Sequence, residues 1–166
     1  MHTHTLSHID IGVDQSARRH VVEGLSKFLA DTYALYVKTQ NFHWNVTGPL
    51  FPALHKFFEE QYQELALAVD VLAERIRALG YIAPGTFRDF IRLTSIEEEP
   101  DLPDAGGMTR SLMEGHELLS KKARILLTKA DDEEDQATVD LLADRIRAHD
   151  KAAWMLRSSL AEGEKF

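Results

Sequence analysis

Two histidines lie on either side of a short helix-breaking turn, and a carboxylate follows the second. His43 and His55 flank a Gly-Pro pair, and Glu59 follows His55 by four positions. Asp70 and Glu74 have the same spacing, which places each pair on one face of a helix. Imidazole and carboxylate ligands suit iron, zinc or manganese. Because the chain has no cysteine, thiolate sites are excluded. The pattern therefore indicates a metal site without sulfur.

Apolar residues at helical spacing predict the elements that carry these ligands, namely four long helices and no strand. The helices are expected at residues 15–42, 51–79, 108–130 and 134–160. Asp14 is expected to cap the first helix, and Gly80 to follow the end of the second. Short links predict two antiparallel helix pairs, and residues 80–107 form a long crossover in which "TFRDFIRL" is expected to be a short extra helix. This is the arrangement of a ferritin-like four-helix bundle, so the fold class is all-α.

Length and composition predict one compact domain. The chain has 166 residues, 44% of them hydrophobic and 28% charged. We expect a bundle at residues 15–160, a flexible N-terminal tail at 1–14 and a short C-terminal tail at 161–166. No apolar run reaches the roughly 18 residues of a membrane span. The N-terminus also lacks the features of a secretory signal, so the sequence predicts a cytoplasmic protein.

The charge distribution argues against strong DNA binding. The formal net charge is -8, and an acidic chain repels the phosphate backbone unless it has a basic patch. Residues 1–17 contain no Lys or Arg, and the tail "AEGEKF" has two Glu against one Lys. Arg18 and Arg19 are the only candidates for DNA contact near the N-terminus. We therefore expect weak or no DNA binding.

The distance between the two ligand pairs is a geometric problem. His55 and Asp70 are fifteen positions apart. At about 1.5 Å per residue they are roughly 22 Å apart along one helix, too far for a single ion. Either there are two unrelated sites, or one site is assembled across a subunit interface. An antiparallel two-fold interface would bring His55 and Glu59 of one chain to Asp70 and Glu74 of its partner, with His43 joining the first pair.

The di-iron site of other ferritin-like bundles is missing from the sequence. Those bundles use Glu-x-x-His on each of two helices. No histidine of this chain has Glu three positions earlier. Before His43, His55, His116 and His149 the residues are Gln40, Pro52, Met113 and Ile146. A site inside one bundle is therefore not expected.

The five-ligand pattern resembles a known family. The spacing His43-x11-His55-x3-Glu59-x10-Asp70-x3-Glu74, within "NFHWNVTGPLFPALHKFFEEQYQELALAVDVLAERIRALG", resembles the Dps family of miniferritins, the DNA-binding proteins from starved cells. The segment "RIRAHDKAAWMLRSSL" resembles the last helix of that family. The pattern differs at Glu59, where the family more often has Asp.

The resemblance implies a ferroxidase and an iron-storage cage. Such a protein forms a hollow homododecamer that oxidises Fe(II), preferably with hydrogen peroxide, and stores ferric mineral, which protects cells from oxidative damage. His43, His55 and Glu59 of one chain, with Asp70 and Glu74 of its partner, are then the catalytic metal ligands. Iron is the expected metal, and zinc can compete for these ligands. The alternative function is a structural nucleoid protein that binds and compacts DNA.

Other residues near these motifs have two interpretations each. Trp44 is either an electron donor beside the iron or an apolar residue that packs at the dimer interface, and we favour packing. Glu60 and Glu64 are either mineral nucleation sites or an ordinary solvated face. Three acidic residues are either the lining of an iron-entry pore or partners of a helix dipole; they are Asp131, Asp140 and Asp144.

The remaining histidines are not expected to be ligands. His116 and His149 lie on the apolar stripes of their helices and are expected to be hydrogen-bonded core residues. His2, His4 and His8 are expected to belong to a disordered tail rather than a metal site.

Overall fold

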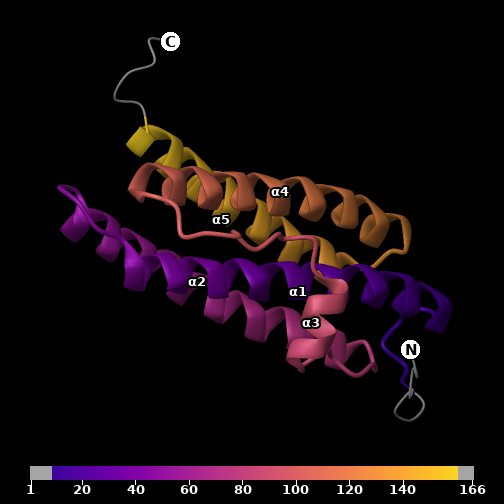
Figure 1. Ribbon diagram of the computed structural model, residues 1–166. Helices are drawn as coiled ribbons and strands as arrows, with labels where there is room; N and C mark the ends of the chain where they lie inside the picture. Colours follow the sequence, from indigo (N-terminus) through magenta and orange to yellow (C-terminus); the bar gives the residue numbers. More distant parts are fainter. Residues whose placement is uncertain (1–8, 161–166) are drawn as a thin grey trace.

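The computed structural model describes residues 9–160, and in that range it contains five helices and no strand (Figure 1). The predicted all-α, ferritin-like bundle with a short extra helix is confirmed. His2, His4, His8 and the tail at 161–166 lie outside the described residues, and the predicted domain bounds stay predictions. No described helix is long and apolar enough to cross a membrane. The helices are α1 (Gln15–Asn45), α2 (Phe51–Ala78), α3 (Phe87–Leu93), α4 (Ala105–Asp132) and α5 (Gln136–Leu160).

The four long helices form two hairpins that pack on each other. α1 pairs with α2, and α4 pairs with α5. The chain leaves α2 at one end of the bundle, forms α3 against α1, and returns along the bundle to begin α4 at the other end (Figure 1). α2 and α4 therefore run in the same direction, and α1 and α5 run opposite to them. The long crossover exists because two parallel helices must be joined across the full length of the bundle.

Glycines allow α1 and α4 to approach closely. A Cβ atom on Gly24 would lie 2.2 Å from Leu126 Cδ1, and one on Gly115 would lie 2.6 Å from Leu35 Cδ1. Both leucines belong to the buried core, so neither could move aside without disturbing its neighbours. The two glycines are therefore a packing requirement of this helix pair.

The helix ends follow their local sequence with one exception. Gly80 has φ 91°, and the amides of Gly80 and Tyr81 donate to the carbonyls of Arg77 and Ile76, which is a Schellman motif. Asp104 caps α4 by accepting from Gly107 N at 2.7 Å. The exception is Asp14, which occupies the predicted N-cap position of α1 but whose side chain makes no capping hydrogen bond. The α1 N-terminus is held instead through Arg18.

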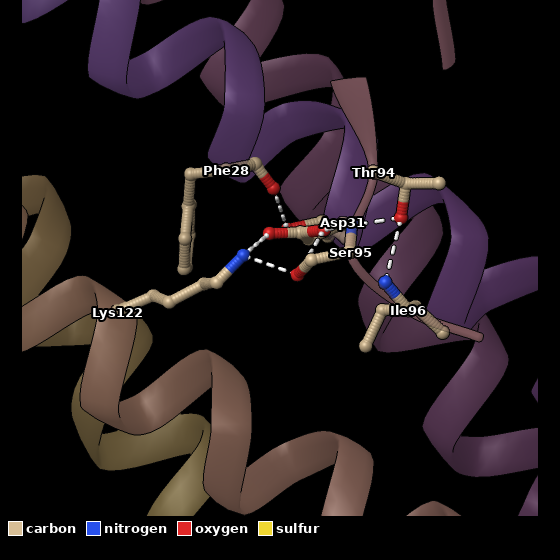
Figure 2. A network of polar contacts seen from close by, with 7 residues as sticks. Phe28, Asp31, Thr94, Ser95, Ile96 and Lys122 are labelled. Atoms are coloured by element: carbon tan, nitrogen blue, oxygen red, sulfur yellow. Dashed lines mark hydrogen bonds and ion pairs between the residues drawn. The ribbon is translucent and has the colours of Figure 1, made fainter. Parts of the chain in front are cut away.

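A buried carboxylate fixes the start of the returning crossover (Figure 2). Asp31 in α1 is 0% exposed and accepts hydrogen bonds from Ser95 N at 2.6 Å and Thr94 Oγ1 at 3.0 Å. Lys122 of α4 contacts its other oxygen at 2.5 Å and also reaches the Ser95 hydroxyl. We call these four residues the crossover latch. It ties α1, the crossover and α4 together, so it also fixes α3 against α1.

Candidate metal centre

His43 and His55 hold each other through their own backbones. His43 Nδ1 donates to the carbonyl of His55 at 2.8 Å, and His55 Nδ1 donates to the carbonyl of His43 at 2.8 Å. The His43 carbonyl lies in the last turn of α1, where helix carbonyls lack a partner within the helix. The tight turn between α1 and α2 thus places each ring over the other helix. The histidine near the end of α1 and the one near the start of α2 therefore each donate a hydrogen bond to the other's backbone carbonyl.

This arrangement fixes the tautomer of both rings. A carbonyl only accepts, so each Nδ1 must carry a proton, and in the neutral ring the lone pair is then on Nε2. The two rings are stacked with centroids 3.9 Å apart and planes 19° apart. Each stacked ring therefore keeps Nε2 as its metal-binding atom, and its Nδ1 bond orients it in the way that metal-ligating histidines are usually oriented.

Glu59 lies one turn after His55 and is engaged by a lysine. Lys56 Nζ lies 3.0 Å from Glu59 Oε2. The hydrogen bond from Lys56 and its charge hold the pKa of Glu59 below its ordinary value, with smaller contributions from His43 and His55. Glu59 is therefore an ionised carboxylate beside two imidazoles, which is a suitable ligand set for iron or zinc.

The structure does not bring Asp70 and Glu74 to the histidines. Both lie exposed on α2, several turns beyond Glu59. Between residues 9 and 160, no group of three or more His, Asp or Glu side chains is close enough to hold a metal ion. One chain therefore offers two partial sets of ligands, His43–His55–Glu59 and Asp70–Glu74.

The carboxylate pair lies on an exposed apolar face. Leu67 is 72% exposed and Val71 is 48% exposed. Together with Asp70 and Glu74 they occupy positions i, i+3, i+4 and i+7 of one helix, which is a single face. This face therefore carries two exposed apolar side chains beside two carboxylates, all of them accessible to a second chain.

Three of the residues with two interpretations have well-defined surroundings. Trp44 is 65% exposed and makes no aromatic ring contact within the described residues, so its role stays a prediction. Glu64 forms a two-pronged ion pair with Arg145 of α5, with one N–O distance of 3.0 Å. Its carboxylate is thus already neutralised, whereas Glu60 is exposed and makes no ion pair in the described part of the chain. Of the two, Glu60 is the better nucleation candidate.

The acidic residues near the start of α5 are exposed and partly paired. Asp131 accepts from Gln136 at 3.2 Å, and Asp144 pairs with Arg147. Asp140 makes no ion pair between residues 9 and 160. The pore assignment stays a prediction for all three.

The buried acid at this end of the bundle is Asp135, which the helix pattern gave no reason to single out. It caps α5 by accepting from Thr138 N at 3.1 Å and pairs with Arg75 of α2 at 2.5 Å. The combination of a cap and an ion pair between helices explains why α5 begins just after this residue.

His116 and His149 are core residues, as predicted, but they are bonded to each other. Their Nδ1 atoms lie 2.9 Å apart between α4 and α5. Burial is the main reason that the pKa of His116 falls to about 3 and that the pKa of His149 is well below its ordinary value. Both rings are therefore neutral at physiological pH. Helical spacing identified each as buried, but only the packing of the helices shows that they are partners.

The two arginines considered for DNA contact both make polar contacts with other residues of the chain. Arg18 is buried and donates to the carbonyls of Leu79, Val13 and Ile9 at 3.0, 3.1 and 3.4 Å. Arg19 is exposed and pairs with Glu23 in the next turn. Arg18 thus anchors the chain before α1 to the end of α2 and has no free donor surface for a phosphate.

Comparison with known proteins agrees with this architecture. A family model described as a ferritin-like domain matches residues 22–166. DNA protection during starvation protein 2 from Bacillus anthracis is 37% identical over 142 residues, covering 86% of this chain and 97% of the relative. The chain belongs to the Dps family of miniferritins.

Other proteins similar to this Dps-family chain match nearly all of its length. A low temperature-induced protein from Nostoc sp. is 40% identical over 158 residues, covering 94% of this chain and 88% of the relative. The crystal structure of a Dps protein from Vibrio cholerae O1 has a TM-score of 0.88 and 32% sequence identity, covering 93% of this chain and 98% of that one. The Vibrio protein is described as a member of a broad superfamily of ferritin-like diiron-carboxylate proteins.

Proposed function

We propose that this protein is a ferroxidase and an iron-storage cage, and that its iron sites are shared between two chains. Fe(II) is the substrate, hydrogen peroxide is the preferred oxidant, and the ferric product is stored inside a homododecamer. The observation that carries this proposal is the pair of locked imidazoles, His43 and His55, beside ionised Glu59. Three ligands leave coordination positions open on iron for the oxidant and for ligands from a partner.

The positions of the ligands on α2 fit a two-fold axis. The midpoint between His55 and Glu74 coincides with the midpoint between Glu59 and Asp70, close to Leu65. If two copies of α2 cross antiparallel at this point, His55 meets Glu74 of the partner and Glu59 meets Asp70 of the partner. One crossing therefore completes two identical sites and covers the exposed apolar face.

The proposed chemistry needs two electrons at one place. Reduction of hydrogen peroxide to water consumes two electrons and two protons, and two Fe(II) ions at one site supply both electrons. A single electron would release hydroxyl radical instead. Sites with several carboxylate and imidazole ligands can hold two irons close together. Zinc binds the same ligand types and is expected to inhibit as a competitor.

A first experiment compares Fe(II) oxidation by the metal-free protein with peroxide and with oxygen, in wild type and in Asp70→Ala. Ferric absorbance is the readout. We expect fast oxidation that prefers peroxide and is reduced at least tenfold in the variant. Equal, slow oxidation in both proteins would contradict the proposal.

Mixing two inactive variants tests whether the site is shared. His55→Ala removes one set of ligands and Asp70→Ala removes the other. In a mixed dimer one site loses both sets, whereas the other site is intact. Unfolding the two variants together and refolding them should therefore restore about a quarter of wild-type activity, since half of the dimers are mixed. A site within one chain would give no recovery, and neither would each variant refolded alone.

DNA compaction is the alternative suggested by the names of the relatives. Two observations argue against DNA compaction: Arg18 is buried, and the net charge of -8 repels the phosphate backbone. A gel-shift with duplex DNA at low and moderate salt should show little retardation at moderate salt. Tight retardation that persists at moderate salt would favour the alternative.

A further inference from the structure

A continuous series of aromatic contacts leads from the ligand histidines along α1. The ring of Tyr62 lies 5.1 Å from that of His43, measured between centroids, at 70°. Tyr62 lies 6.2 Å from Tyr36, and Tyr36 lies 5.7 Å from Tyr33. These distances are those of aromatic rings in contact. We call Tyr62, Tyr36 and Tyr33 the tyrosine relay.

The relay ends against the crossover. Tyr33 stacks on Phe90 of α3, with centroids 4.3 Å apart and planes 18° apart. Phe90 lacks a hydroxyl and cannot form a phenoxyl radical. The series of phenols that begins at the ligand histidines therefore ends at α3. All three tyrosines are partly buried.

Packing alone does not require phenols at these positions. In the described residues, the only hydrogen bond to a relay hydroxyl is the one that Gln40 Nε2 donates to Tyr36 at 3.2 Å. Phenylalanine would fill the same space at Tyr33 and Tyr62 without losing a bond. What the phenol adds is chemistry, because it can lose one electron and one proton to give a neutral phenoxyl radical.

We propose that the tyrosine relay supplies the second electron when only one Fe(II) occupies a site, which rests on the proposed ferroxidase function. Fe(II) gives one electron to hydrogen peroxide and becomes Fe(III). Tyr62 gives the second electron and releases its phenolic proton. With one further proton from solvent, the O–O bond breaks and two water molecules form. The products are Fe(III), a Tyr62 phenoxyl radical and water, so no hydroxyl radical is released.

The radical then moves along the relay and returns when iron arrives. Tyr36 transfers an electron and a proton to the Tyr62 radical, and Tyr33 does the same for Tyr36. This holds one oxidising equivalent away from His43 and His55. When a second Fe(II) binds, its electron and a proton restore the phenol. The sum of both steps is the ordinary reaction, in which two Fe(II) reduce one peroxide to water.

Electron paramagnetic resonance tests the relay directly. The metal-free wild-type protein is mixed with equimolar Fe(II) and then with peroxide, and samples are frozen at increasing times. We expect a tyrosyl radical that decays on addition of more Fe(II). Tyr62→Phe should lose at least nine-tenths of this signal and release more hydroxyl radical to a spin trap. In Tyr33→Phe/Tyr36→Phe the radical should form but decay faster.

The fourth tyrosine is the matched control. Tyr81 is buried and its hydroxyl donates to the carbonyl of Gln15 at 3.3 Å, outside the relay. Tyr81→Phe should leave the radical unchanged. An undiminished signal in Tyr62→Phe, or an equal loss in Tyr81→Phe, would overturn the relay.

Failure of the relay and failure of the ferroxidase have different signatures. Wild-type protein that oxidises Fe(II) without any tyrosyl radical would overturn the relay and leave the ferroxidase standing. Wild-type protein that does not oxidise Fe(II) faster than buffer would overturn both. Asp70→Ala should reduce Fe(II) oxidation and the radical signal together, at least tenfold, if the radical depends on the complete site.

Discussion

His116 and His149 share one hydrogen bond in the middle of the bundle, and neither ring has another polar partner in the part of the chain that the structure describes. One Nδ1 donates to the other over 2.9 Å, so the pair is bonded when both rings are neutral. Both Nε2 atoms are buried. Adding a proton would place a charge in the core between α4 and α5, close to the positive Arg145.

This pair should make the bundle sensitive to acid. The unfolded chain protonates both rings below about pH 6.5. The folded chain does not, because the pKa of His116 is about 3 and that of His149 is also lowered. Their contribution to stability is therefore complete above pH 6.5 and is lost as the pH falls toward 3, by at most about 2.7 kcal/mol per pH unit. Urea unfolding at fixed protein concentration between pH 7 and pH 5 measures it.

The matched variant for this prediction is His116→Gln/His149→Gln. An amide pair keeps a hydrogen bond in the core but does not titrate. The variant should lose less stability than wild type over the same pH range. A parallel decline of both proteins would mean that other groups govern the acid response.

The crossover latch should control the stability of the returning segment. Asp31→Ala removes a carboxylate that is 0% exposed and leaves Lys122 without its partner. Breaking a buried pair from one side costs about 3–5 kcal/mol, and Lys122 is partly exposed, so we expect the lower part of that range. Thermal unfolding gives the loss of stability, and limited proteolysis should show earlier cleavage near Ser95. Exposed Asp101→Ala is the control and should change neither.

Glu60 and Glu64 should differ in mineral growth. Arg145 is 8% exposed and neutralises Glu64, whereas Glu60 is free to bind ferric ions if it faces the cage interior. Glu60→Ala should slow the later growth phase of ferric absorbance several-fold, without slowing the first oxidation of Fe(II). Glu64→Ala should change growth less but lower stability, because it leaves the Arg145 charge unpaired. Equal growth rates in both variants would refute the assignment of Glu60.

Lys56 should weaken the binding of iron to Glu59. Its ammonium lies 3.0 Å from the carboxylate and competes with the metal for the same oxygen. Lys56→Gln should therefore tighten Fe(II) or Zn(II) binding several-fold, measured by titration calorimetry. The Lys56 bond also holds the pKa of Glu59 below its ordinary value, so this pKa should rise in the variant. Protonation of Glu59 should therefore displace the metal at a higher pH in Lys56→Gln than in wild type. Binding that is no tighter in Lys56→Gln would show that the pair is not a competitor.

Much of this protein could be predicted from local sequence. Apolar spacing gave the four helices, and "TFRDFIRL" gave α3, whose cap Thr86 accepts from Asp89 N at 3.2 Å. Gly80 ended α2 with a left-handed residue, as its type allows. Asp14 stands at the predicted N-cap position but makes no side-chain capping bond, and tertiary bonds of Arg18 hold the chain before α1 to the end of α2. Such bonds connect residues far apart in the chain, so no local pattern reveals them.

The sequence by itself determined which residues can bind a metal and that one helix could not bring them all to one ion. The tertiary structure decided how they are presented. The tight turn between α1 and α2 locks the rings of His43 and His55 in one tautomer, which spacing alone does not specify. It also decided that Glu64 is neutralised by Arg145 and that Tyr62 touches His43. Spacing along a helix fixes which side chains share a face, but contacts between faces depend on how the helices pack.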